Sequence, residues 1–142
     1  MRTPDEPVVR IVKQWLIHAD EDLCMAVHAM TLQAGEPPYR LIAYHAQQCA
    51  EKCLKAFLVC CRVDFPYTHN ISTLLELCGE YCDWAGELQD AERLTLYSIT
   101  TRYPGEDEEV SRAEATQAVE IAQQVRNRVR IELRKLGVDL PE

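Results

Sequence analysis

The chain has 142 residues, 47% of them hydrophobic and 27% charged, which fits one globular domain spanning 1–142 and excludes a disordered chain. The net charge of −8 argues against wholesale binding to a phosphate backbone, although one small basic pocket is compatible with it. No apolar run is long enough for a membrane span, and the proline-rich start is not a secretory signal, so we expect a cytoplasmic protein whose seven cysteines are mostly reduced.

Glycine and proline lie only where periodic segments end. They leave three long stretches uninterrupted, at about 8–34, 38–63 and 111–136, with a shorter pair between 71 and 102. Apolar residues recur in the long stretches every three or four residues, as on one helical face. The sequence therefore predicts an all-α, antiparallel up-and-down bundle of four to five helices, of about 25, 25, 15, 15 and 25 residues, with its core at about 8–136.

Capping signals mark two helix starts and one helix end. Ser111 and Glu114 have the spacing of a capping box at the start of the last helix, and Gly137 predicts a left-handed stop at its end. Thr73 and Glu76 predict a second capping box at the start of the third helix.

The segment 39–56, which reads YRLIAYHAQQCAEKCLKA, is the most distinctive part of the chain. It resembles the second helix of HEPN domains, which reads aromatic-His-Ala-Gln-Gln-x-Ala-Glu-Lys-x-Leu-Lys-Ala. Three further blocks resemble the family in the same order. They are an opening helix with Trp15, Ala19 and Asp22, the loop 65–70 (FPYTHN), and the segments 94–97 (LTLY) and 101–105 (TRYPG).

This resemblance, which covers about 8–136, implies a helical bundle that dimerises and binds a nucleotide or RNA. It also implies a partner, a separately encoded minimal nucleotidyltransferase, and in some members a toxin–antitoxin pair. Combined with the chemistry of the side chains, it predicts seven nucleotide-binding residues: Arg40, Tyr44, Lys52, Lys55, His69, Arg102 and Tyr103. We expect neither a cofactor nor a metal.

The polar residues of the segment 39–56 allow two interpretations. Five of them follow one another at intervals of four, three, four and four residues and therefore share one helical face: Arg40, Tyr44, Gln47, Glu51 and Lys55. An adjacent polar row consists of His45, Gln48 and Lys52. The first interpretation is a solvated face or a polar dimer interface, in which an exposed Glu51–Lys55 pair contributes about 0.2–0.5 kcal/mol. The second is a surface that holds a phosphate and stacks a base.

Three other polar segments each allow a structural and a functional interpretation, and for His69 and the basic run the structural one is favoured. The segment 102–105 (RYPG) is either a helix stop or a contact for a phosphate and a base. His69, in a loop before a helix N-terminus, is either structural or placed to meet an anion. The basic run 126–135 either complements the helix dipole and pairs with acids from 76–92, or faces an anion or RNA.

A ribonuclease is the alternative function. Catalytic HEPN domains resemble one another in an Arg-x4–6-His motif near the start of the final helix, where Arg stabilises phosphate charge and His acts as acid or base. Here Arg126-Asn127 is followed by Ile-Glu-Leu at 131–133, so the histidine is missing, while Arg40 with His45 and Arg62 with His69 match the spacing in other parts of the chain, where chance matches are expected. We therefore place noncatalytic binding first. A metal-independent endoribonuclease toxin, with Arg40 and His45 acting across a dimer cleft, is second, and a protein-interaction module is third.

Two cysteine pairs raise the question of a metal. Cys49 and Cys53, like Cys78 and Cys82, lie one helical turn apart, so two helices could in principle share a four-sulfur site. Structural zinc usually uses tighter Cys-x2-Cys turns, and the first pair lies on an apolar stripe, where free cysteine packs as a small hydrophobe. We therefore expect these cysteines to pack in the core.

Overall fold

The computed structural model describes residues 3–98 and 109–141. These residues form four α-helices and one 3-10 helix, and they contain no strand. The elements are α1 (Glu6–Ala29), α2 (Tyr39–Cys60), α3 (Ile71–Gly79), η1 (Ala85–Ser98) and α4 (Arg112–Lys135). The predicted all-α bundle is confirmed. No helix in the described ranges is both long and apolar enough to cross a membrane.

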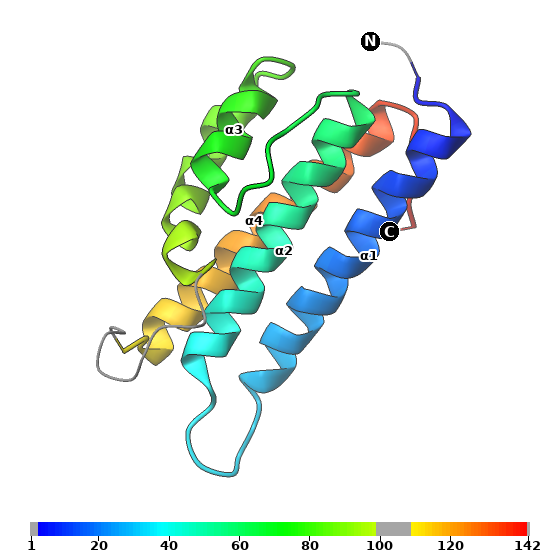
Figure 1. Cartoon of the computed structure of the whole chain (residues 1–142). Coiled ribbons are helices and arrows are strands. Elements are labelled where there is room, and N and C mark those ends of the chain that lie inside the picture. Colours follow the sequence, from blue (N-terminus) through cyan, green and yellow to red (C-terminus); the bar gives the residue numbers. More distant parts are fainter. Residues whose placement is uncertain (1–2, 99–108, 142) are drawn as a thin grey trace.

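The central helix of the bundle is α2. In Figure 1, α1 runs antiparallel to α2 on one side, α3 and η1 form a second pair on the other side, and α4 crosses behind. Because all four elements pack against α2, 15 of its 22 residues are buried. Small side chains on α2 let the neighbouring helices approach closely: Ala43, Ala46, Cys49, Ala50, Cys53 and Ala56.

The last helix starts and ends as predicted. The Glu114 N–H donates to Ser111 Oγ and the Ser111 N–H donates to Glu114 Oε1, both at 3.1 Å, which confirms the capping box. These hydrogen bonds from Ser111 lower the pKa of Glu114 from its ordinary value. Gly137 has φ +99° directly after the C-cap residue Leu136, which confirms the left-handed stop.

The shorter pair of helices differs from the prediction in length and type. The cap of α3 is Asn70, whose side chain accepts a hydrogen bond from the Thr73 N–H at 3.2 Å. Thr73 therefore lies inside the first turn of a nine-residue helix, and the capping box predicted there is wrong. The segment predicted as a fourth α-helix is η1, which consists of two 3-10 pieces joined by a kink at Leu88 (φ −105°, ψ 19°). Its buried residues recur every three positions: Ala85, Leu88, Ala91 and Leu94.

Three of the four paired cysteines are core residues. Cys49, Cys53 and Cys78 are buried, which confirms the prediction of core packing, while Cys82 is half-buried. The hydrogen bond with Cys49, followed by burial, raises the pKa of the Cys53 thiol. Within the described ranges no three histidine, cysteine, aspartate or glutamate side chains group as metal ligands would.

Candidate functional site

Three polar residues of α2, Gln47, Glu51 and Lys55, are buried. Gln47 is 0% exposed, Glu51 3% and Lys55 4%, so the interpretation of this face as solvated is wrong. The segment 61–70, which connects α2 to α3, covers them: its aromatic side chains contact Lys55, and His69 contacts Gln47 and Glu51. The Glu51–Lys55 pair is therefore a buried ion pair, whose energetics differ from those of an exposed pair.

Glu51 is the centre of a connected hydrogen-bond network. Its Oε1 accepts from Gln47 Nε2 at 3.0 Å and lies 2.8 Å from His69 Nδ1, while its Oε2 accepts from Lys55 Nζ at 3.0 Å. Gln47 Nε2 also donates to the His69 carbonyl oxygen at 3.2 Å, and Gln47 Oε1 accepts from Gln48 Nε2 at 2.7 Å. Each buried side chain thus has a partner, which offsets the cost of removing it from water.

An aromatic cage encloses the Lys55 ammonium group. Nζ lies 5.5 Å from the ring centroid of Trp15 on α1, and 5.8 and 5.9 Å from those of Phe65 and Tyr67 in the connecting segment. These cation–π contacts join α1, α2 and the connecting segment around one charge. Lys55, one of the predicted binding residues, is therefore buried, and its ammonium group makes a cation–π contact with the exposed ring of Tyr67.

A second carboxylate, Asp22 on α1, holds two further polar residues of α2. Its Oδ1 lies 2.8 Å from His45 Nδ1, and its Oδ2 accepts a hydrogen bond from Lys52 Nζ at 2.5 Å. The ring of Tyr44 packs edge-on against that of His45, with 5.3 Å between their centroids. Asp22 therefore fixes the directions of the imidazole and of the ammonium group.

We define the signature face as the residues that this arrangement presents on one side of α2: Tyr44, His45, Gln48, Lys52, Tyr67 and His69. Tyr67 is 93% exposed, and the side chain of His69 is 47% exposed. Three of the predicted binding residues, Tyr44, Lys52 and His69, lie on this face. Asp22 and Tyr67 were not predicted as site residues, although both belong to blocks that resemble the family; Glu51 was placed on the polar face of α2 but without its role as the acceptor that holds His69.

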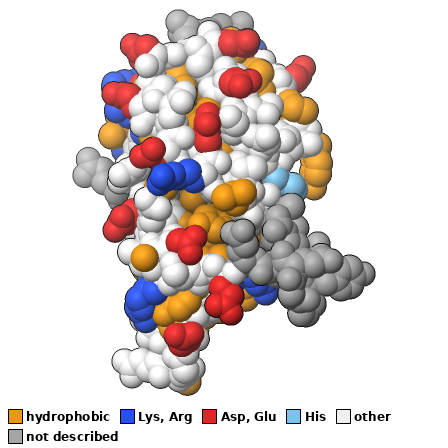
Figure 2. All heavy atoms as spheres, turned by 90° about the vertical axis from the view of Figure 1, so that its left-hand side faces the viewer, with side chains coloured by type: hydrophobic (Ala, Val, Ile, Leu, Met, Phe, Trp, Pro, Cys, Tyr) orange, Lys and Arg blue, Asp and Glu red, His pale blue; other side chains and the backbone are white. Residues whose placement is uncertain are grey.

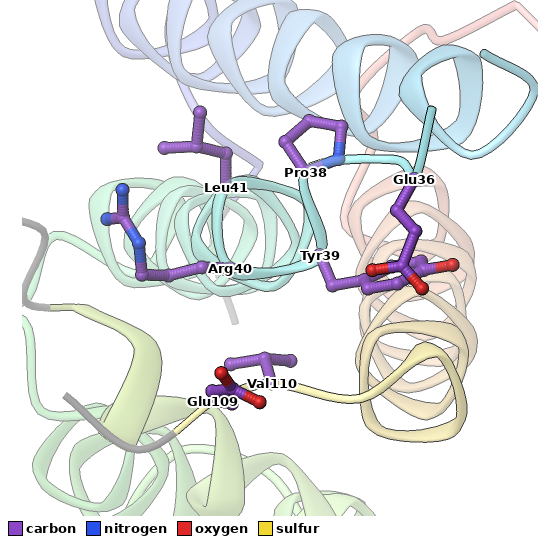
Figure 3. Close-up of a pocket in the computed structure, with 7 residues that line it drawn as sticks. All are labelled: Glu36, Pro38, Tyr39, Arg40, Leu41, Glu109 and Val110. Atoms are coloured by element: carbon purple, nitrogen blue, oxygen red, sulfur yellow. The ribbon is translucent and has the colours of Figure 1, made fainter. Parts of the chain in front are cut away.

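Arg40 lies at the start of α2, beside a hollow of about 400 Å³. Figure 3 shows Arg40 and Tyr39 extending to opposite sides of the helix start, with Glu109 and Val110 on the facing segment. Glu36 and Glu109 give this hollow two carboxylates for one guanidinium, which disfavours a phosphate. Two other predicted binding residues, Arg102 and Tyr103, lie outside the described residues.

The proposed nuclease pair does not converge within one chain. Arg40 and His45 are five residues apart on α2, which places them about 140° apart around the helix axis. Arg40 extends beside the hollow with Glu109, whereas His45 turns to Asp22 on α1. A general acid or base must lie within hydrogen-bond reach of the proton that it transfers, so a nuclease site built from Arg40 and His45 would need the two residues to come from different subunits of a dimer, which stays a hypothesis.

The basic run on α4 is paired with several different elements. Arg128 contacts Glu87 at 2.9 Å, as predicted for acids of 76–92, but Arg126 donates to Asp20 on α1 at 2.6 Å. Arg130 and Arg134 each donate to the Pro141 carbonyl oxygen at 2.7 Å. The contact with Asp20 raises the pKa of Arg126, whereas burial, followed by the charge of Arg126, lowers the pKa of Arg130.

A second hollow, of about 410 Å³, lies along this part of α4 and is lined by Arg126, Asn127, Arg130, Ile131 and Arg134. Ile131, which is 47% exposed, occupies the first position at which the catalytic motif would place a histidine after Arg126. The hollow therefore has cations but no group that takes up or releases a proton near neutral pH.

The face formed by α3 and η1 is acidic. Figure 2 shows carboxylates distributed across this side of the molecule, and exposed acidic residues on or beside these two elements include Glu76, Glu80, Glu87 and Asp90. Like charge repels a polyphosphate from this side.

Comparison with known proteins agrees with the arrangement of the helices. The family model described as HEPN domain matches residues 12–132. The crystal structure of an archaeal HEPN homologue superposes with a TM-score of 0.66 at 26% sequence identity, covering 86% of this chain and 97% of that one. No curated protein matches the chain significantly. The chain therefore belongs to the HEPN domain family.

Proposed function

We propose that this HEPN domain is a noncatalytic module that binds a nucleotide, or the end of a nucleic acid, on its signature face. The observation that carries the proposal is that Asp22 and Glu51 hold the side chains of His45, Lys52 and His69 in fixed directions on one side of α2. A preorganised set of donors and acceptors loses little entropy when a ligand binds.

The chemistry of this face suits a mononucleotide. Lys52 supplies a cation for a phosphate, and the exposed ring of Tyr67 supplies a flat surface on which a base can stack. The net charge of −8 and the acidic face of α3 and η1 oppose a long nucleic-acid duplex. A small ligand needs only the local cation and aromatic ring, so it avoids most of this repulsion.

The proposal is tested by calorimetric titration of the protein with ATP, GTP and a short single-stranded RNA. We expect one nucleotide to bind and the RNA to stay intact. Lys52→Ala and Tyr67→Ala should each weaken the affinity at least about fivefold, because a charged hydrogen bond or a stacking contact contributes about 1–3 kcal/mol. Lys135→Ala, on the exposed end of α4, is the control and should change nothing. Unchanged affinity in both face variants would refute the proposal.

We also propose that the chain forms a homodimer through the exposed side of α1. Exposed apolar side chains lie along this helix and just beyond it: Ile11, Ile17, Met25 and Leu32. Patches of this kind mark protein interfaces in soluble proteins. In light scattering, the double variant Ile17→Glu, Met25→Glu should be monomeric, whereas Leu96→Glu, at an even more exposed site on η1, should remain dimeric. A monomeric wild-type protein would contradict the proposal.

The partner that the family resemblance implies, a minimal nucleotidyltransferase, is part of the same proposal. The proposed module only binds, so any chemistry on the bound nucleotide would require a second protein. We expect the protein to co-purify with the nucleotidyltransferase encoded in the same genome. Loss of co-purification in Ile17→Glu would indicate binding through the exposed side of α1, and loss in Lys52→Ala would indicate binding through the signature face. No co-purification would contradict this part of the proposal.

A further inference from the structure

We propose that Asp22 and Glu51 are positioning residues that hold His45 and His69 in the Nδ1–H tautomer, so that the signature face presents two imidazole acceptors and selects ligands with ribose hydroxyl groups. This inference rests on the proposed function and specifies the part of the nucleotide that the face recognises.

The tautomer follows from the two carboxylate contacts. Nδ1 of His45 lies 2.8 Å from Asp22 Oδ1, and Nδ1 of His69 lies 2.8 Å from Glu51 Oε1. An ionised carboxylate only accepts hydrogen bonds, so the ring nitrogen that faces it must carry the proton. In a neutral ring the proton on Nδ1 leaves a lone pair on Nε2, and this second nitrogen is the one available to a ligand.

Both carboxylates are themselves held in place. Glu51 is buried and also receives hydrogen bonds from Gln47 and Lys55. Asp22 receives a second hydrogen bond from Lys52. Neither carboxylate can turn away from its imidazole without leaving a buried or half-buried donor unpaired, which costs about 1–3 kcal/mol. The ring orientations are therefore set by the interior of the domain and not by solvent.

A lone pair on Nε2 determines the chemistry of the ligand. It accepts a hydrogen bond from a hydroxyl group but makes none with a fully ionised phosphate, which is also an acceptor. Lys52 is the donor for phosphate on this face, so the two histidines are left to recognise groups that donate. Ribose hydroxyl groups are donors that either imidazole can accept from, and a 2′,3′-dideoxynucleotide lacks them.

Long-range ¹H–¹⁵N correlation spectra at about pH 8 test the tautomers directly. The chain has four histidines, and the exposed His18 and His28 on α1 serve as internal references. We expect Nδ1–H for His45 and His69, and the Nε2–H form favoured by free imidazole for the references. In Glu51→Gln the amide can donate to Nδ1, so His69 alone should change tautomer. The Nε2–H form at both His45 and His69 in the wild-type protein would overturn the inference.

Affinities for a nucleotide and its 2′,3′-dideoxy analogue test the ligand chemistry. We expect the analogue to bind at least about fivefold more weakly, and this ratio to fall in Asp22→Asn, which keeps the size of the side chain and leaves His69 held by Glu51. Glu21→Gln, the neighbouring exposed position, is the matched control and should keep the ratio. Equal affinities in the wild-type protein would overturn the inference and leave the proposed function standing, whereas binding of neither ligand would overturn both.

Discussion

Removal of the Glu51 carboxylate is the most informative perturbation of stability. In Glu51→Ala, the Lys55 ammonium stays inside its aromatic cage without a counter-ion, and donors on Gln47 and His69 lose their acceptor. Removing one partner of a buried ion pair costs about 3–5 kcal/mol. Glu51 and Lys55 have side-chain exposures of only 4% and 5%, so solvent screening does not reduce this figure.

A double-mutant cycle separates the ion pair from the rest of the network. Lys55→Met should cost less than Glu51→Ala, because Glu51 keeps two donors and the methionine sulfur packs among aromatic rings. The loss of unfolding free energy in the double variant should be smaller than the sum of the two single-variant losses by about 1–3 kcal/mol. Urea unfolding followed by far-ultraviolet circular dichroism measures all four free energies.

The control is Lys135→Ala, which removes an exposed ion pair with Glu132 and should change the free energy of unfolding by less than about 1 kcal/mol. An exposed ion pair on a helix contributes only about 0.5 kcal/mol to stability. The contrary result is therefore a loss of this size in the unfolding free energy of Glu51→Ala, with no coupling to Lys55. That result would refute the assignment of the pair to the interior.

Three further predictions concern helix ends, and thermal or urea unfolding measures each. Ser111→Ala should cost about 1 kcal/mol at neutral pH. Hydrogen bonds with Ser111 lower the pKa of Glu114, so the stability that the Glu114 carboxylate contributes is present above its ordinary pKa of 4.5 and is lost as the pH falls through the lower pKa of the folded state. The difference in free energy of unfolding between the wild-type protein and Ser111→Ala should therefore become smaller at acid pH. A difference that grows at acid pH would contradict this prediction. Gly137→Ala should cost at least about 1 kcal/mol, because φ is +99° and the added Cβ would lie 2.9 Å from Thr3 Cγ2; Thr3→Ser in the same chain should recover part of the loss, and an unchanged midpoint for Gly137→Ala would refute the strain. Arg62→Gly should leave stability unchanged or raise it by up to about 1 kcal/mol, because Arg62 has φ +59° and the ion pair of its side chain with Asp5 is exposed; a clear loss would mean that this ion pair outweighs the strain.

The long helices were predictable from the sequence because local signals agree with tertiary packing. The stretch predicted at 111–136 is the helix Arg112–Lys135, with a capping box at one end and a glycine at the other. The third helix was predicted too long, and its cap was misplaced by three residues. Asn70 and Thr73 are both suitable caps, and the choice between them depends on burial of Ile71 and Leu74, which is a property of the folded chain.

The candidate site was less predictable than the fold. Helical periodicity places Gln47, Glu51 and Lys55 on one face, but it cannot show that the segment 61–70 covers that face. Their burial depends on contacts between residues up to about 40 positions apart, such as Lys55 with Trp15. The sequence motif of α2 therefore reflects a buried network at least as much as a binding surface.

The most direct test of the account is nuclear magnetic resonance mapping of nucleotide binding on the isotopically labelled protein. During a titration with ATP or GTP, we expect the largest backbone shifts around Tyr44, Lys52 and His69, with little change along α4 or on the acidic face of α3 and η1. Shifts concentrated at Arg126 and Arg130 in the α4 hollow would place the ligand elsewhere. Either that pattern or the absence of shifts with both nucleotides would contradict the claim that the signature face is the binding site.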